Sequence, residues 1–193
     1  MAQVVETYTD DKLHLKKFNP ATMRDSCVVV FVAMKGSGKS TCMADFMWHK
    51  RHIPSGFIFS ATEESNEFFS KMVPAMYCYG DLNVEKLQEV YDYQEVKIKK
   101  YKKTAEQRQA AKIAHGDPDM DDNDLEKIDF WAVWDRDPHI FGTIEDLMYD
   151  QKSFKTPIMR NLFMNGRHHK MFMMITVQYV MDMPRALRSN VDY

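Results

Sequence analysis

The stretch CVVVFVAMKGSGKST, residues Cys27–Thr41, decides the fold class of this 193-residue chain. Its first part, Cys27–Ala33, is a continuous apolar run rich in β-branched residues, which is typical of a strand buried on both faces of a parallel sheet. Lys39–His52 then predicts a helix that stops at Pro54–Gly56, and Phe57–Ala61 predicts a second short buried strand. Strand, glycine-rich turn, helix and strand form a βαβ unit. We therefore predict an α/β protein whose central, mostly parallel sheet is flanked by helices.

The turn after the first strand carries a phosphate-binding motif. Residues 33–41, AMKGSGKST, fit the pattern G-x-x-x-x-G-K-[ST], with alanine in place of the first glycine. Glycines let successive backbone N–H groups point at phosphate oxygens, and the following helix adds its positive N-terminal end. Lys39 is expected to reach the β- and γ-phosphates, Ser40 to ligate Mg²⁺ and Thr41 to help hold the α-phosphate. The predicted cofactor-binding residues are Ala33, Lys35, Gly36, Ser37, Gly38, Lys39, Ser40 and Thr41.

Hydrolysis of a bound triphosphate also needs acidic residues at the end of a neighbouring strand. One acid holds the Mg²⁺ shell and a second polarises the attacking water. Glu145 and Asp146 follow a predicted strand at His139–Glu145, whereas Asp135 follows the apolar run Trp131–Trp134. A plain surface turn is the alternative for each site, and the residues alone leave the choice open.

Two further features lie towards the C-terminus. A helix is predicted at Pro157–Asn165, with proline in its first turn, and a strand at Met171–Val177. Gln178 follows this strand, where it is a candidate sensor of the γ-phosphate or of the water. The candidates for an arginine finger that reaches a neighbouring subunit's nucleotide are Arg160, Arg167, Arg185 and Arg188.

The charges are strongly segregated, although the net charge is only −2. A long helical pattern runs from Val84 to about His115, and Gly116–Asp124 predicts a loop. Together they indicate a charged helical excursion at about residues 84–129 from a single domain that covers residues 1–193. The basic run Lys97–Lys103 is a candidate for contact with a phosphate backbone, and a solvated helix face is the alternative.

The remaining composition limits the class of protein. The longest apolar run, Cys27–Met34, is too short to cross a bilayer, so no membrane span is expected. The three cysteines, Cys27, Cys42 and Cys78, fall on apolar patterns and are expected to be reduced core residues.

Four segments in order carry a family resemblance: FVAMKGSGKST, EDLMYDQKSF, RNLFMNGRHHKMFMMITVQY and MPRALRSNVDY. They resemble the genome-packaging ATPases of the nucleocytoplasmic large DNA viruses, which belong with the FtsK–HerA translocases among the P-loop motors. The resemblance covers about residues 27–193, is most specific at Tyr149–Arg188, and implies a RecA/ASCE-like P-loop NTPase fold. Because an acidic pair precedes a short L/M-Y-D segment in that family, the resemblance favours Glu145 and Asp146 over Asp135.

The same resemblance assigns roles to the site residues. It makes Glu145 the support for Mg²⁺, Asp146 the catalytic acid and Gln178 the strand-end sensor, and Arg188 lies in its best-matching tail. Two departures stand out. Glutamate replaces the commoner aspartate at position 145, and relatives continue beyond VDY into another strand, so we expect the sheet to lack a C-terminal edge strand.

The function implied by the resemblance is an ATP-hydrolysing motor that moves double-stranded viral DNA into the capsid. It implies ATP and Mg²⁺ as cofactors, DNA contact without sequence preference and a ring, expected to be a hexamer, with capsid or portal proteins as candidate partners. The implied location is the host cytoplasm at viral assembly sites, with association with the virion as an alternative. Two other hypotheses remain: a small P-loop nucleotide kinase, for which no arginine-rich lid pattern is present, and a nucleotide-dependent assembly module with little turnover.

Overall fold

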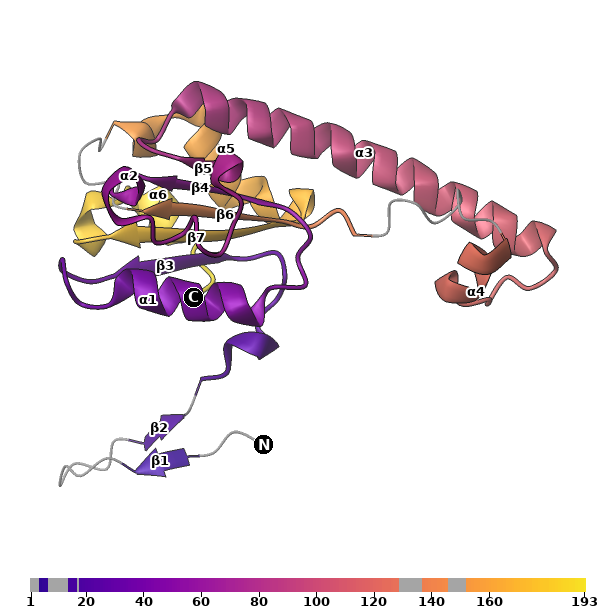
Figure 1. Cartoon of the computed structure of the whole chain (residues 1–193), viewed down its shortest axis with the longest axis horizontal. Coiled ribbons are helices and arrows are strands. Elements are labelled where there is room, and N and C mark those ends of the chain that lie inside the picture. The colour runs from indigo at the N-terminus through magenta and orange to yellow at the C-terminus, as the bar shows by residue number, and fades with distance from the viewer. Residues whose placement is uncertain (1–3, 7–13, 17, 129–136, 146–151) are drawn as a thin grey trace.

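The computed structural model describes residues 4–6, 14–16, 18–128, 137–145 and 152–193 (Figure 1). Its strands are β1 (Val4–Glu6), β2 (His14–Lys16), β3 (Val28–Val32), β4 (Gly56–Ser60), β5 (Cys78–Tyr79), β6 (Ile140–Glu145) and β7 (Met171–Val177). Its helices are α1 (Lys39–His49), α2 (Glu63–Asn66), α3 (Val84–Ala114), α4 (Asp122–Ile128), α5 (Pro157–Asn165) and α6 (Arg185–Arg188).

Five of these strands form one parallel sheet in the order β3-β7-β6-β4-β5. The predicted α/β class is therefore confirmed. Every residue of β7 is buried, because neighbouring strands flank it on both sides and helices cover both faces. The edge strand β5 has only two residues, too few for a hydrophobic pattern, and for that reason it was not predicted.

Helices cover the two faces of this sheet in separate layers (Figure 1). Because side chains alternate along a strand, Phe172 and Met174 of β7 face α1, where Met43 and Phe46 meet them. The other face packs against α3, α5 and α6 in a larger core. Its helical members are Leu87, Tyr91, Ile158, Met159, Leu162, Phe163 and Leu187. The helices thus cover the faces of the sheet, and the predicted site residues lie at the carboxyl ends of its strands and in the loops that follow them.

Most predicted elements match the structure to within a few residues, and α5 and β7 match at both ends. Two expectations are wrong. The predicted loop Gly116–Asp124 ends early, because α4 begins at Asp122. This short helix is stabilised by the burial of Leu125 and by ion pairs from Asp122 to α3. Cys42 is exposed on α1, since the apolar side of that helix passes through other positions.

Helix α3 forms an arm that extends beyond the sheet (Figure 1). Its 31 residues span about 46 Å at the usual rise per residue. Leu87 and Tyr91 hold its first turns on the core, and further along Gln94 donates hydrogen bonds of 2.7 Å to the carbonyls of Pro138 and His169. The far end leaves the body and carries α4. No helix among the described residues has the length and apolar character that crossing a membrane requires.

The outer edge of β3 is contacted by the last residues of the chain. Val30 N–H donates to the Tyr193 carbonyl at 3.0 Å, and Asp192 N–H donates to the Val28 carbonyl at 2.9 Å. In the described ranges no sixth strand pairs with β3 on this edge.

Candidate nucleotide-binding site

The phosphate-binding loop lies between β3 and α1, and its backbone requires glycine at two positions. Gly36 has φ of +77° and Gly38 has φ of +86°, a left-handed region that other residues adopt at a cost of about 1–2 kcal/mol. Gly38 caps α1, and its carbonyl accepts the Cys42 N–H at 2.9 Å. The first N–H groups of α1 are therefore directed at the loop, as anion binding at a helix N-terminus requires.

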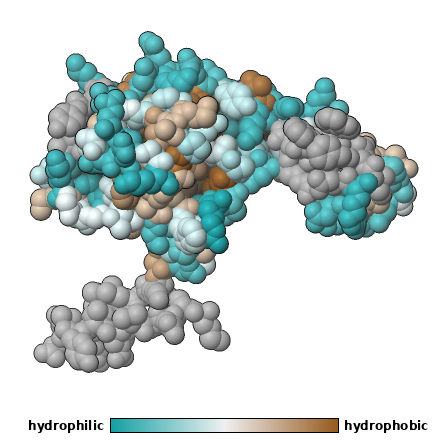
Figure 2. Space-filling view, viewed as in Figure 1, coloured by the Kyte–Doolittle hydropathy of each residue, from teal (hydrophilic) through white to brown (hydrophobic). Residues whose placement is uncertain are grey.

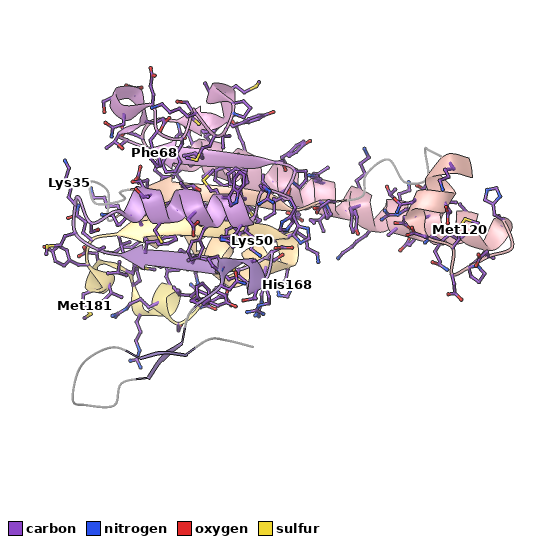
Figure 3. All side chains as sticks on the ribbon, turned by 60° about the horizontal axis from the view of Figure 1, so that its bottom comes forward. Lys35, Lys50, Phe68, Met120, His168 and Met181 are labelled. Carbon is purple, nitrogen blue, oxygen red and sulfur yellow. The ribbon has the colours of Figure 1, made fainter. Side chains whose placement is uncertain are left out.

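The lysine of the loop folds back over the loop's own backbone. Lys39 Nζ donates to the carbonyls of Ala33 at 2.9 Å and Met34 at 3.0 Å. Ser37 Oγ donates to the same Met34 carbonyl at 2.7 Å. A phosphate offers Lys39 a charged acceptor, which makes a stronger hydrogen bond than a carbonyl does. Lys35 is exposed on the same loop, at the end of the body far from Lys50 (Figure 3).

Glu145 joins the loop to the neighbouring strand. It is the last residue of β6, and its Oε1 accepts a short hydrogen bond from Ser40 Oγ at the start of α1. Its Oε2 accepts from Ser60 Oγ at 2.6 Å, and Thr62 Oγ1 lies 3.5 Å from the same oxygen. The structure thus brings together Ser40 and Glu145, two predicted site residues that are 105 positions apart in the sequence.

The donor set fits a magnesium ion. A serine hydroxyl that donates its proton to Glu145 keeps its oxygen lone pairs for a cation, and Mg²⁺ prefers oxygen ligands. Both carboxylate oxygens of Glu145 already accept hydrogen bonds, so the carboxylate is held in place before any ion binds. Ser40 and Glu145 are thus the residues that would hold Mg²⁺, which would neutralise charge on the phosphates.

Ser60 and Thr62 are functional candidates that the sequence reasoning missed. Ser60 ends β4 opposite Glu145 in the strand register, and only 1% of it is exposed. The signal was present, because a polar residue after the buried run FIF resembles the placement of Gln178 after β7. The sequence alone could not show that Ser60 belongs to the site, because it does not reveal that β4 and β6 are neighbours.

Glu63 fixes the turn that follows these two residues. Its buried carboxylate accepts the backbone N–H groups of Phe69 at 3.0 Å and Ser70 at 2.7 Å. Desolvation raises the pKa of Glu63, but these hydrogen bonds lower it by more, so the pKa lies below its ordinary value. The charged form of Glu63 therefore stabilises the backbone beside Thr62.

The other predicted site residues have different outcomes. Gln178 is half-buried directly after β7, between the strands that lead to the loop and to Glu145. Asp146 and the rival Asp135 lie outside the described residues. Arg188 lies in α6 with Nη1 at 3.0 Å from Met181 Sδ of the same chain, while Arg160, Arg167 and Arg185 are exposed. The role of an arginine finger stays a prediction for all four.

Comparisons with known proteins place this geometry in context. No protein-family profile matches the chain. It is 30% identical over 165 residues to the uncharacterized protein 075L of Invertebrate iridescent virus 6, covering 85% of this chain and 51% of that protein. It is 26% identical over 184 residues to the uncharacterized protein L437 of Acanthamoeba polyphaga mimivirus, covering 95% and 56%. The chain thus spans about half the length of these viral relatives.

Two solved structures share the fold. ATPases 2 and 3 of EssC from Geobacillus thermodenitrificans superpose with a TM-score of 0.51 at 16% identity, over 93% of this chain and 33% of that one. The pCW3 conjugation coupling protein TcpA, solved with ATPγS, gives 0.51 at 14% identity over 98% and 52%. The chain therefore has the α/β, RecA-like fold of P-loop ATPases, as predicted.

Proposed function

We propose that this chain is the ATPase domain of a motor that translocates double-stranded viral DNA into the capsid. The observation that carries the proposal is the contact between Ser40 of the loop and Glu145 of β6. This contact joins a phosphate-binding loop to the acidic strand end that hydrolysis needs. An acid beside the loop's serine is the arrangement that holds Mg²⁺ against the β- and γ-phosphates.

In this mechanism the residues of the loop bind and orient ATP. The N–H groups of residues 35–41 and Lys39 hold the phosphates, and Ser40 with Glu145 holds Mg²⁺. Asp146, the next residue after Glu145, polarises the attacking water, and Gln178 senses the γ-phosphate from the end of β7. Arg188 is retained as the proposed finger, and its present contact with Met181 has to open for that role.

The assignment to viral DNA rests on the four sequence segments that resemble the packaging ATPases. Relatives from an iridescent virus and a mimivirus are in keeping with it. A chain of this kind works as a ring, which we take to be a hexamer, at assembly sites in the host cytoplasm, with capsid or portal proteins as partners. Exposed lysines of α3, Lys100, Lys102 and Lys103, are proposed to hold the DNA backbone without reading its sequence.

The test is the rate of phosphate release from ATP with and without duplex DNA. Duplexes of unrelated sequence are expected to stimulate the wild-type chain equally. Lys39→Ala is expected to abolish both basal and stimulated release, because it removes the charge that holds the phosphates. Lys35→Ala serves as the matched control, because it removes an exposed side chain of the same loop and keeps the backbone N–H that is proposed to bind phosphate. A folded, ATP-binding chain that duplex DNA does not stimulate, or one that phosphorylates nucleoside monophosphates, would contradict the proposal.

A further inference from the structure

An apolar pocket lies on the body, lined by residues from the C-terminal part of α1 and by the segment between α2 and β5. Its volume is about 560 Å³, within the range of ordinary ligand-binding cavities. Trp48 and Met72 line it, although 64% and 44% of their surfaces are exposed. Figure 2 shows hydrophobic residues in the middle of this view of the body, framed by hydrophilic ones. A surface of this kind is typical of a binding site.

The charges around this pocket are of one sign. Lys50, Arg51 and Lys71 line it, and no aspartate or glutamate does so in the described part of the chain. Lys50 is 3% exposed and paired with Asp25 at 2.7 Å, so its charge is largely compensated. Arg51 stacks on Trp48, with its Cζ 4.5 Å from the ring centroid, and the side chain of Lys71 is exposed. The pocket thus suits a segment that offers apolar side chains and negative charge.

The end of the α3 arm has this chemistry. Residues 117–127, DPDMDDNDLEK, contain six acidic residues against Lys127. Apolar side chains accompany them, since Met120 is partly exposed and Ile113, on the last turn of α3, is 61% exposed. The ion pairs of Asp122 with Arg108 and Lys112 join α4 to the last turns of α3, so the two helices hold each other in place.

The arm places this acidic end away from its own body. Figures 1 and 3 both show α4 standing clear of the sheet, and Met120 lies at the opposite side from Lys35 and well beyond Lys50. The pocket is therefore not covered by the acidic end of the same chain. A second copy can supply that end, because a rigid helix of about 46 Å reaches past its own body.

We propose that the acidic end of the α3 arm, residues 113–127, docks in the pocket of Trp48, Arg51, Lys71 and Met72 on a second copy of this chain. The contact joins different surfaces of the two copies, so each copy can give its arm to one neighbour and receive another's. Contacts of this type build rings when the rotation between copies closes. The docking needs neither ATP nor DNA, and its failure leaves the proposed catalytic function untouched.

The experiment is sedimentation velocity of the full chain without nucleotide at low ionic strength, where surface charges are least screened. Lys71→Glu and Asp119→Lys are each expected to weaken self-association about tenfold, since each places like charges together at the docking site. Both side chains are exposed, so unchanged thermal unfolding is the check on folding. An equimolar mixture of the two variants is expected to recover association, because the unchanged arm of the Lys71→Glu chain meets the unchanged pocket of the Asp119→Lys chain. At the other contacts the two exchanged charges again have opposite signs.

Several results would overturn the docking. A wild-type chain that stays monomeric at about 100 μM would show that the arm and the pocket do not bind each other at that concentration, which would exclude the docking. Single variants that associate like the wild type, or a mixture that does not recover, would also exclude it. Lys103→Glu is the matched control on the basic run of the arm, and an equal loss there would place the contact on that run instead. A synthetic 113–127 peptide that fails to compete with wild-type self-association would also exclude the docking.

Discussion

Ser60 holds the carboxylate on which the proposed magnesium site depends, and Ser60→Ala isolates that hydrogen bond. Ser60 Oγ donates to Glu145 Oε2 at 2.6 Å from a position that is 1% exposed. A hydrogen bond to a charged group contributes about 1.5–3 kcal/mol. The lower end applies because Glu145 is only partly buried and Ser40 continues to hold its other oxygen. We therefore expect the turnover rate at saturating ATP and Mg²⁺ to fall about tenfold, which corresponds to about 1.4 kcal/mol.

The assay is steady-state phosphate release, together with the affinity for ATP measured without Mg²⁺. That affinity is expected to stay unchanged, because within the described residues the Ser60 hydroxyl bonds to Glu145 and Thr62, which lie outside the phosphate-binding loop. Thr62→Val is the matched control, since its hydroxyl lies 3.5 Å from the same oxygen and should cost less than threefold, under about 0.7 kcal/mol. A Ser60→Ala chain with wild-type turnover, or a Thr62→Val chain that is equally impaired, would refute the reasoning.

Three further predictions concern stability and DNA. In Gly142→Ala the new Cβ would lie 2.4 Å from Phe57 Cζ and 2.6 Å from Met173 Sδ. This overpacking should cost about 1–3 kcal/mol of stability and lower Tm by about 5 °C. Gly166→Ala is the control and should leave Tm nearly unchanged, because the nearest atom to its new Cβ is at 3.8 Å. The pKa of Glu63 is held below its ordinary 4.5, so the stability that its charged form contributes is present above that pH and is lost as pH falls through the lowered pKa. Urea unfolding of Glu63→Gln should therefore show a smaller loss of stability on acidification than the wild type. An equal loss would contradict this. Replacing Lys100 and Lys103 by alanine should weaken binding to all duplexes alike and reduce the slope of log K against log salt by about 2, whereas an unchanged slope would remove α3 from the DNA surface.

The sequence by itself determined the features that are local in the chain. The loop at residues 33–41 is contiguous in the chain, so its glycines, lysine and serine predict phosphate binding without any knowledge of the fold. The nearly continuous apolar run at Met171–Val177 is typical of a parallel strand that is covered on both faces. The proline at the start of Pro157–Asn165 is typical of the first turn of a helix. In each case the signal and the element occupy the same residues.

Only the tertiary structure decided which distant residues meet. Ser40, Ser60 and Glu145 come together because strand order and register bring three carboxyl ends to one edge, and periodicity along the chain encodes neither. The segregation of charge predicted a helical excursion at about residues 84–129, but not that a short helix forms where a loop was predicted. That helix exists because Leu125 is buried and Asp122 pairs with α3, contacts that arise only once the arm has folded.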